Sequence, residues 1–236
     1  IFTSDHEWAA AVCEAIIAKS PGIAWSCTNG IRADSADPEL FALMRRAGCF
    51  RVYLGLESGS EEVLRAFGKG GRATLDSAEL AVRKARAAGL EPNAFFLVGL
   101  TGDTSQTMQS TIDLARRLEL DTMKCGICVP FPGTQMFNTL QRGGHIKTLD
   151  WDAYTVYNDA DAIFDHPTLE WPTIIRYFRR FYRQAYFGNP RYLWRRLRYA
   201  LRAREVTWNL WYAMRFLFML VAGRGHSTDT PYAHRD

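Results

Sequence analysis

One carboxylate stands where an otherwise apolar, β-rich run ends. The run closes on Leu56, Glu57 follows it, and Ser58-Gly59-Ser60 interrupts the pattern before a new helix begins. In parallel α/β proteins, ligands bind at the carboxyl ends of the strands. Glu57 could therefore accept hydrogen bonds from a polar ligand such as a sugar, or it could cap the helix that opens at Ser60. The spacing alone leaves both interpretations open.

A lysine between glycines is the second residue whose surroundings suggest chemistry. Lys69 lies in the segment Gly68-Lys-Gly-Gly71. Such a flexible segment could fold a cation over an anionic ligand group. The spacing does not match a phosphate-binding loop of the G-x-x-x-x-G-K-[ST] type. A solvated loop lysine is the alternative.

The five cysteines are best explained as buried thiols. Cys125-Gly-Ile-Cys128 has the spacing of half a zinc site, but no second pair or nearby histidine completes four ligands. Both residues fall in a predicted strand, where positions three apart point to opposite faces. Cys13, Cys27 and Cys49 also occupy core-like positions. An odd number of cysteines in no regular array favours a reducing compartment, so we expect a cytoplasmic protein.

A glycine-containing turn joins another apolar run to a helix. In Gly99-Leu-Thr-Gly-Asp-Thr104, the glycines would let the backbone approach a ligand, and the amides of the helix opening at Ser105 would face it. The segment lacks the G-x-G-x-x-G pattern, so it does not indicate a dinucleotide site. A tight strand-to-helix turn would explain both glycines equally well.

The elements that position these residues alternate between helix and strand. Helices are predicted from a capping box at Ser4 to Lys19, and over 38–47, 60–67, 74–88 and 105–118; strands are predicted over 23–28, 50–56, 93–100 and 122–129. This alternation predicts parallel pairing through right-handed crossovers. The strands look apolar on both faces. A doubly wound sheet and part of a barrel both fit this pattern.

The character of the chain changes in its last third. We expect one domain over residues 1–149 and a helical extension over 150–236, with helices near 171–187, 190–204 and 206–222. Residues 1–175 carry 16 Lys/Arg and 22 Asp/Glu, a net charge of −6, whereas residues 176–236 carry 13 and 3, a net charge of +10. The overall pI of about 8.8 is therefore a property of the tail.

Ten arginines between Arg176 and Arg204 are interleaved with aromatic residues. They could bind nucleic acid, dock on the acidic body of the chain, or contact anionic lipid at the inner face of a membrane. The apolar run over 206–222 is interrupted by Asn209 and Arg215, and it is too short for a confident membrane span. A helix packed on the body or lying at an interface is the expectation.

An ordered set of motifs resembles the radical S-adenosylmethionine (SAM) superfamily, in particular its cobalamin-binding branch. The matching segments are Trp25-Ser-Cys27, Arg32-Ala-Asp34, Ala47-Gly-Cys49, Gly55-Leu-Glu-Ser-Gly-Ser60, Phe96-Leu-Val-Gly-Leu-Thr-Gly-Asp-Thr104, Pro130-Phe-Pro-Gly-Thr134 and Phe181–Tyr192. This resemblance implies a partial TIM-like (β/α)6 barrel, of which the four strands here would be the last four, with a C-terminal helical extension. The cofactor site would lie at the carboxyl ends of the strands.

The resemblance also implies roles for individual residues. Glu57 would contact the SAM ribose, Lys69 would lie near the SAM carboxylate, backbone groups at Leu97 would meet the adenine, and Arg32 would line the same mouth. The implied cofactors are SAM, a [4Fe–4S] cluster and cobalamin. The implied partners are an electron-donor protein and a small-molecule or lipid-like substrate.

Several features depart from the family pattern. The CxxxCxxC motif that holds the cluster is absent, because no two cysteines of this chain are separated by three residues. The segment between Cys27 and Arg32 looks about two residues longer than usual, and Thr101 and Asp103 replace the usual Pro and Glu. The chain begins with Ile1, so we expect an excised piece that is inactive alone, with the enzyme being the parent protein. A radical SAM enzyme acting on transfer RNA and a non-catalytic α/β binding module are the alternatives.

Overall fold

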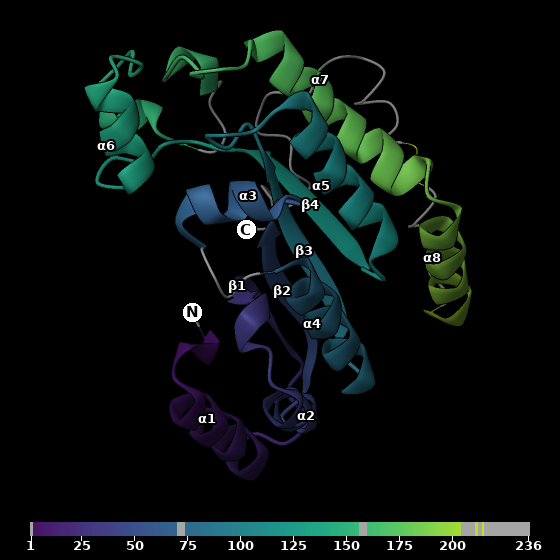
Figure 1. Ribbon diagram of the computed structural model, residues 1–236. Coiled ribbons are helices and arrows are strands. Elements are labelled where there is room, and N and C mark those ends of the chain that lie inside the picture. Colours follow the sequence, from purple (N-terminus) through teal and green to yellow (C-terminus); the bar gives the residue numbers. More distant parts are fainter. Residues whose placement is uncertain (1, 70–73, 156–159, 204–210, 212–213, 215–236) are drawn as a thin grey trace.

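Figure 1 shows the computed structural model, in which helices pack along a single twisted sheet. The structure describes residues 2–69, 74–155 and 160–203, together with Trp211 and Met214. The sheet has the order β1-β2-β3-β4, and every neighbouring pair is parallel. The strands are β1 (Trp25–Arg32), β2 (Cys49–Glu57), β3 (Glu91–Val98) and β4 (Thr122–Ile127). The predicted parallel α/β fold is confirmed.

The predicted helices are also present, mostly within two residues of their expected ends. They are α1 (His6–Lys19), α2 (Pro38–Arg46), α3 (Glu61–Leu64), α4 (Leu75–Ala87), α5 (Ser105–Arg117), α6 (Gln135–Arg142), α7 (Trp171–Tyr182) and α8 (Pro190–Ala203). Short π-helical turns follow α3 (Arg65–Lys69) and α7 (Arg183–Phe187). Side-chain caps explain several starts, because Thr74 and Thr104 each form a capping box with the residue three positions on.

Two expectations about the first elements were wrong. The N-cap of α1 is Asp5, not Ser4: the Asp5 carboxylate accepts a hydrogen bond from the Trp8 amide at 2.9 Å, while Ser4 ends a short 3-10 turn. Strand β1 runs to Arg32 instead of Thr28, because a bulge interrupts its pairing. The four steps from Cys27 to Ile31 pair with only two steps of β2, and this accounts for the two extra residues seen in the sequence.

The two faces of the sheet differ, contrary to the expectation that both are apolar. On β2, Val52, Leu54 and Leu56 belong to the buried core with the helices, as do Ala94, Phe96 and Val98 on β3. The alternate positions present polar and aromatic side chains instead, among them Arg51, Tyr53, Glu57, Phe95 and Lys124. Helices against one face and a mixed opposite face are the arrangement of a barrel wall, in which ligands bind at the carboxyl ends of the strands.

The open edge of β4 is closed by tyrosines of the C-terminal helices. The hydroxyl of Tyr186 accepts a hydrogen bond from the Met123 amide at 2.8 Å and donates one to the Met123 carbonyl; Tyr182 does the same for Cys125. Because β4 is the last strand in the sheet order, these backbone groups have no neighbouring strand. Helix α7 also contributes Ile174, Tyr177 and Phe181 to the core, so it is packed on the sheet (Figure 1).

The remaining C-terminal expectations are only partly within the described residues. The helices expected near 171–187 and 190–204 are present as α7 with its π-turn and as α8. The helix expected over 206–222 falls outside the described residues, apart from Trp211 and Met214. Within the described part of the chain, no helix combines the length and apolar character needed to cross a membrane. The division at residue 149/150 stays a prediction.

Candidate active site

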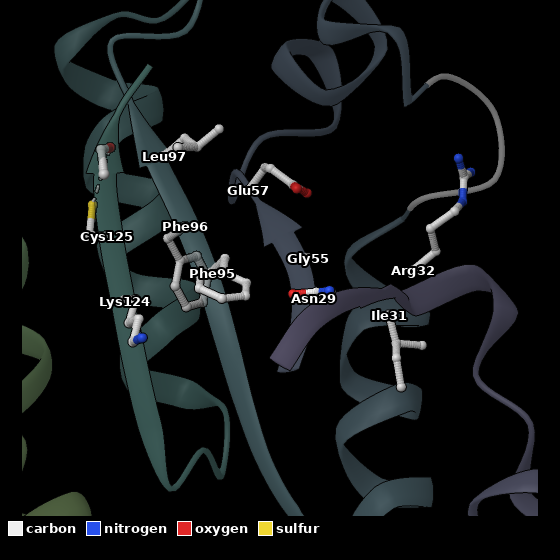
Figure 2. Close-up of a pocket in the computed structure, with 12 residues that line it drawn as sticks. Asn29, Ile31, Arg32, Gly55, Glu57, Phe95, Phe96, Leu97, Lys124 and Cys125 are labelled. Carbon is white, nitrogen blue, oxygen red and sulfur yellow. Dashed lines mark hydrogen bonds between the residues drawn. The ribbon is translucent and has the colours of Figure 1, made fainter. Parts of the chain in front are cut away.

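A cavity of about 540 Å³ opens along the inner face of all four strands, toward their carboxyl ends. Figure 2 shows how its lining residues converge from β1, β2, β3 and β4. They are Asn29, Gly30, Ile31, Arg32, Gly55, Glu57, Phe95, Phe96, Leu97, Lys124, Cys125 and Gly126. The volume lies within the range of small-molecule sites, roughly 300–1,000 Å³. Three of the four predicted site residues, Arg32, Glu57 and Leu97, are thus brought together.

The backbone of Glu57 has an unusual conformation that sets the direction of its side chain. Glu57 is the last residue of β2, follows an irregularity in the pairing with β3, and has φ 55°, the one left-handed non-glycine residue in the described part of the chain. Such a conformation costs about 1–2 kcal/mol for a residue with a β-carbon. Strain of this kind persists where the surrounding structure enforces it, and it clusters at binding sites.

The segment Ser58-Gly59-Ser60, which follows Glu57, packs against α5 and holds the Glu57 backbone in this conformation. The Gly59 amide donates to Thr111 Oγ1 on α5 at 2.9 Å, and a β-carbon at Gly59 would meet the Ser110 carbonyl oxygen at 2.3 Å. Only glycine therefore fits between β2 and α5. Ser60 caps α3 by accepting from the Val63 amide at 3.4 Å. The helix cap that Glu57 could have supplied is provided by Ser60.

Arg32 lines the cavity, and its positive charge is paired with the carboxylate of Asp34. Its Nε and Nη2 donate to the two carboxylate oxygens of Asp34 at 3.0 and 2.7 Å. This bidentate pair raises the pKa of Arg32, first through the hydrogen bonds and then through the negative charge of Asp34. Arg32 is thus held in place by Asp34 and is not an isolated cation for a ligand.

The expectation for Lys69 is untested. Its backbone ends the π-helical turn after α3, and its side chain lies outside the described part of the chain. Gly68, in the same turn, has φ 83°, and a β-carbon at that position would have nothing within 4 Å. The role of Lys69 stays a prediction.

Lys124, Phe95 and Asn29 line the cavity without having been predicted from the sequence. Lys124 is an exposed cation in the middle of the short strand β4, the same signal that drew attention to Glu57. Asn29 lines the cavity from the bulge in β1. The extra length of the segment between Cys27 and Arg32 was the feature of the sequence that could have indicated it. Phe95 could not be distinguished from a core aromatic by periodicity alone.

The glycine turn after β3 packs against a helix and is not part of the cavity. A β-carbon at Gly99, where φ is 72°, would approach Ile174 Cγ2 of α7 to 3.0 Å. The buried Asp103 carboxylate accepts from the Leu100 amide at 2.9 Å and from the Thr107 hydroxyl at 2.7 Å. Desolvation raises the pKa of Asp103. This segment is therefore a tight strand-to-helix turn that packs against α7, which was the second of the two interpretations of its glycines.

The thiols of this chain do not fit an iron–sulfur cluster. All five cysteines are buried, as expected, and no group of three His, Cys, Asp or Glu among the described residues could hold a metal ion. Burial raises the pKa of Cys49 to about 11 and that of Cys128 to about 12, and it also raises the pKa of Cys125. Cluster ligation requires thiolates, and these environments disfavour them.

The other lining residues do fit the nucleoside part of SAM. The Glu57 carboxylate is an acceptor-only group suited to ribose hydroxyls. Leu97 lends the adjoining wall the apolar character that an adenine face requires. Both lie at the carboxyl ends of the strands, in the same cavity.

Comparison with known proteins gives a consistent family. The Radical SAM superfamily model matches residues 11–115. An uncharacterised methyltransferase of Pyrococcus horikoshii is 30% identical over 58% of this chain and 29% of its own length. An anaerobic magnesium-protoporphyrin IX monomethyl ester cyclase of Rubrivivax gelatinosus is 27% identical over 60% of this chain and 25% of its own. The chain therefore spans between a quarter and a third of the length of these relatives.

Two solved structures share the fold. A radical S-adenosylmethionine methyltransferase of Kitasatospora setae, TsrM, solved with cobalamin and a [4Fe–4S] cluster, superposes with a TM-score of 0.54 at 22% identity, covering 63% of this chain and 28% of that one. Coproporphyrinogen III oxidase of Escherichia coli gives a TM-score of 0.53 at 14% identity, covering 76% and 37%. At these identities the likeness concerns the partial-barrel architecture.

Proposed function

We propose that the whole protein, whose residues 11–115 match the Radical SAM superfamily model, binds SAM at the cavity described above and uses it for radical chemistry. When bound, the [4Fe–4S] cluster would supply one electron for the reductive cleavage of SAM, which would permit hydrogen abstraction from a substrate. The electron comes from a donor protein. This chain's own part is to bind and orient the nucleoside.

The observation that carries the proposal is the position of Glu57. Its carboxylate lines the cavity from the carboxyl end of β2, where a left-handed backbone and the Gly59–α5 contact fix its direction. A carboxylate held in this way can accept hydrogen bonds from the ribose hydroxyls, while Leu97 on the neighbouring strand lines the wall beside it. Glu57 thus acts as a binding and orienting group, with no proton transfer required of it.

The cluster ligands are proposed to lie outside these 236 residues. The chain has no CxxxCxxC motif, and its five thiols are buried. A chain that holds only the nucleoside wall of the site is expected to be inactive by itself. The proposal therefore concerns the whole protein.

The relatives support a finer proposal about the reaction. Their names include methyltransferases and a cyclase of a magnesium porphyrin ester. We propose that the whole protein methylates or cyclises an unactivated small-molecule or lipid-like substrate with the help of cobalamin. A transfer RNA substrate remains the second candidate, favoured by the arginine-rich tail.

The test is anaerobic incubation of the reconstituted whole protein with SAM and a one-electron reductant, with 5′-deoxyadenosine and methionine measured as products. We expect both products, together with weaker SAM binding in Glu57→Gln by about tenfold, because the amide can accept at only one oxygen and carries no charge. The control is Glu119→Gln, at an exposed carboxylate far from the cavity. Absence of both products, with the cluster intact, would overturn the proposal.

A further inference from the structure

Four cavity residues form a single row across the sheet. The strand register pairs Arg32 with Gly55, Gly55 with Phe95, and Phe95 with Lys124. Neighbouring strands are about 4.8 Å apart, so the backbones of Arg32 and Lys124 at the ends of the row are about 14 Å apart along the sheet. All four residues line the cavity, which therefore has a positive group at each side (Figure 2).

The two cations differ in the groups that contact them within the protein. Arg32 is held by the Asp34 carboxylate. Lys124, in contrast, forms no ion pair with any carboxylate of the described residues. Its ammonium lies 5.2 Å from the centre of the Tyr53 ring and 5.8 Å from that of Phe95. The aromatic faces position the cation without neutralising its charge.

The surroundings leave Lys124 accessible from the mouth of the cavity. The next residue on the same face of β4 is Gly126, so no side chain of that strand stands between the ammonium and the strand end. Tyr53 and Phe95 stack with their ring centres 5.0 Å apart and provide an apolar surface beside it. A cation next to an apolar surface is suited to a ligand that has both an anionic and an apolar part.

A buried amide on the same face gives an independent indication of polar binding. Asn93 pairs in register with Tyr53 and Thr122, two residues before the row, and it is fully buried. Neither polar atom of its side chain has a hydrogen-bond partner in the described structure. Buried amides in packed cores are nearly always paired. The inner face of this sheet therefore carries more polar capacity than its own packing uses.

We propose that Lys124, with Tyr53 and Phe95, forms a subsite for the carboxylate of an organic acid that has an apolar or aromatic body. The carboxylate bonds to the Lys124 ammonium, and the body lies along Phe95 toward Leu97. That this acid is the reacting substrate rests on the proposed function. The subsite itself rests only on the geometry of Tyr53 on β2, Phe95 on β3 and Lys124 on β4.

The proposed subsite and the part of the cavity proposed to bind the nucleoside, at Glu57 and Leu97, carry opposite charges. Glu57 lies on β2 and Lys124 on β4, about 10 Å apart across two strand spacings. The Glu57 carboxylate repels an anion, whereas Lys124 attracts it. An acid entering the cavity is therefore directed to the β4 side, and the β2 side is left for an uncharged hydroxyl-bearing group.

The test uses the whole protein and two fluorescent probes, 1-pyrenebutyrate and its uncharged amide, in fluorescence titrations. We expect wild type to bind the acid about tenfold more tightly than the amide, and the preference to fall with rising salt. Lys124→Met retains an unbranched side chain over the rings but lacks the charge, so it should lose the preference through weaker acid binding alone. Lys124→Arg should keep it.

The control is Lys147→Met, since Lys147 pairs with Asp165 outside the cavity and should leave the preference unchanged. Equal binding of acid and amide by wild type, or an undiminished preference in Lys124→Met, would overturn the subsite. SAM binding measured on the same samples tests the proposed function separately. Loss of SAM binding with the acid preference intact would overturn only the assignment of the acid as a SAM-dependent substrate.

Discussion

The hydroxyl of Tyr182 is hydrogen-bonded twice to Cys125, accepting from its backbone amide at 3.1 Å and donating to its carbonyl at 2.9 Å. The two residues are 57 positions apart, and the contact joins helix α7 to the outer edge of β4. A side-chain hydroxyl therefore takes the place that the backbone of another strand would occupy. Burial raises the pKa of Tyr182, so the hydroxyl stays protonated and can keep both roles.

Tyr182→Phe should destabilise the protein by about 1–3 kcal/mol, because it leaves a buried amide and carbonyl of β4 without partners while hardly changing the packing. The measurement is the denaturant midpoint of unfolding. Tyr199→Phe serves as the control, since Tyr199 is exposed, and it should shift the midpoint little. Equal shifts in the two variants would contradict the edge-closing role.

Gly99→Ala and Gly133→Ala separate backbone strain from a steric clash. Both glycines have a positive φ, but a β-carbon at Gly99 would meet Ile174 Cγ2 at 3.0 Å, whereas nothing lies within 4 Å at Gly133. Each variant should lose about 1 kcal/mol from strain, and Gly99→Ala should lose about 1–3 kcal/mol more from crowding.

Thermal unfolding measures the difference between the two glycine variants. Ile174→Leu removes the branched methyl group that causes the contact, so its combination with Gly99→Ala should recover part of the extra loss. Equal destabilisation at Gly99 and Gly133 would contradict the close packing of α7 on this turn.

His166 should make stability depend on pH. Its Nδ1 accepts from the amides of Thr168 and Leu169, and Nε2 lies 3.3 Å from the Leu100 carbonyl, so the neutral ring fits this site. Burial lowers the pKa of His166 below the usual value of about 6.5, so the unfolded chain binds the proton more readily. The stabilisation is therefore complete above about pH 6.5 and is lost as pH falls toward the lower folded-state pKa.

Unfolding free energies measured across this range check the effect. His166→Gln should flatten the pH dependence, because it removes the group whose pKa differs between the folded and the unfolded chain. A pH profile of His166→Gln that matches wild type would show that another group is responsible.

The contact between α8 and a membrane stays a prediction, and the structure sharpens its test. Exposed apolar side chains recur at helical spacing on α8, at Leu193, Trp194, Leu197 and Leu201, in a segment rich in arginine and without acidic residues. Such a helix should bind vesicles that contain phosphatidylglycerol and ignore pure phosphatidylcholine. Trp194→Ala and Arg198→Glu should each weaken co-sedimentation with the anionic vesicles.

Arg195 is unsuited to that test, because its guanidinium donates to the Leu120 carbonyl and a charge reversal there would disturb the fold. Arg142→Glu on α6 is the matched surface control. Salt-sensitive RNA binding in place of vesicle binding, lost in Arg198→Glu, would instead favour the transfer RNA alternative.

Local signals predicted most of the fold, while contacts between distant segments could not be predicted. The capping residues Asp37, Thr74 and Thr104 give helix starts that the structure reproduces. The need for glycine at position 59 depends on the Ser110 backbone, about 50 residues away, and no periodicity reports such an approach. Bulges are equally nonlocal, because their position depends on the partner strand, and this is why the end of β1 was misplaced.

The residues of the site were likewise predictable only where the sequence carried a local signal. The lone carboxylate at position 57 was predictable because a charge in an apolar run is a local anomaly, and Lys124 carried the same anomaly on β4. The tail tyrosines gave no comparable signal. The composition of the tail left nucleic-acid binding, docking on the body and lipid contact open, and the hydroxyls of Tyr182 and Tyr186 prove to bond to β4 inside the molecule.

The left-handed backbone at Glu57 has a consequence for mutational drift. Glycine adopts φ 55° without the penalty that a β-carbon incurs, so Glu57→Gly would relieve strain and remove the carboxylate in one step. Random mutation filtered only for folding would thus tend to erase this side chain. A lineage that no longer binds a ligand at this position should therefore lose Glu57 early.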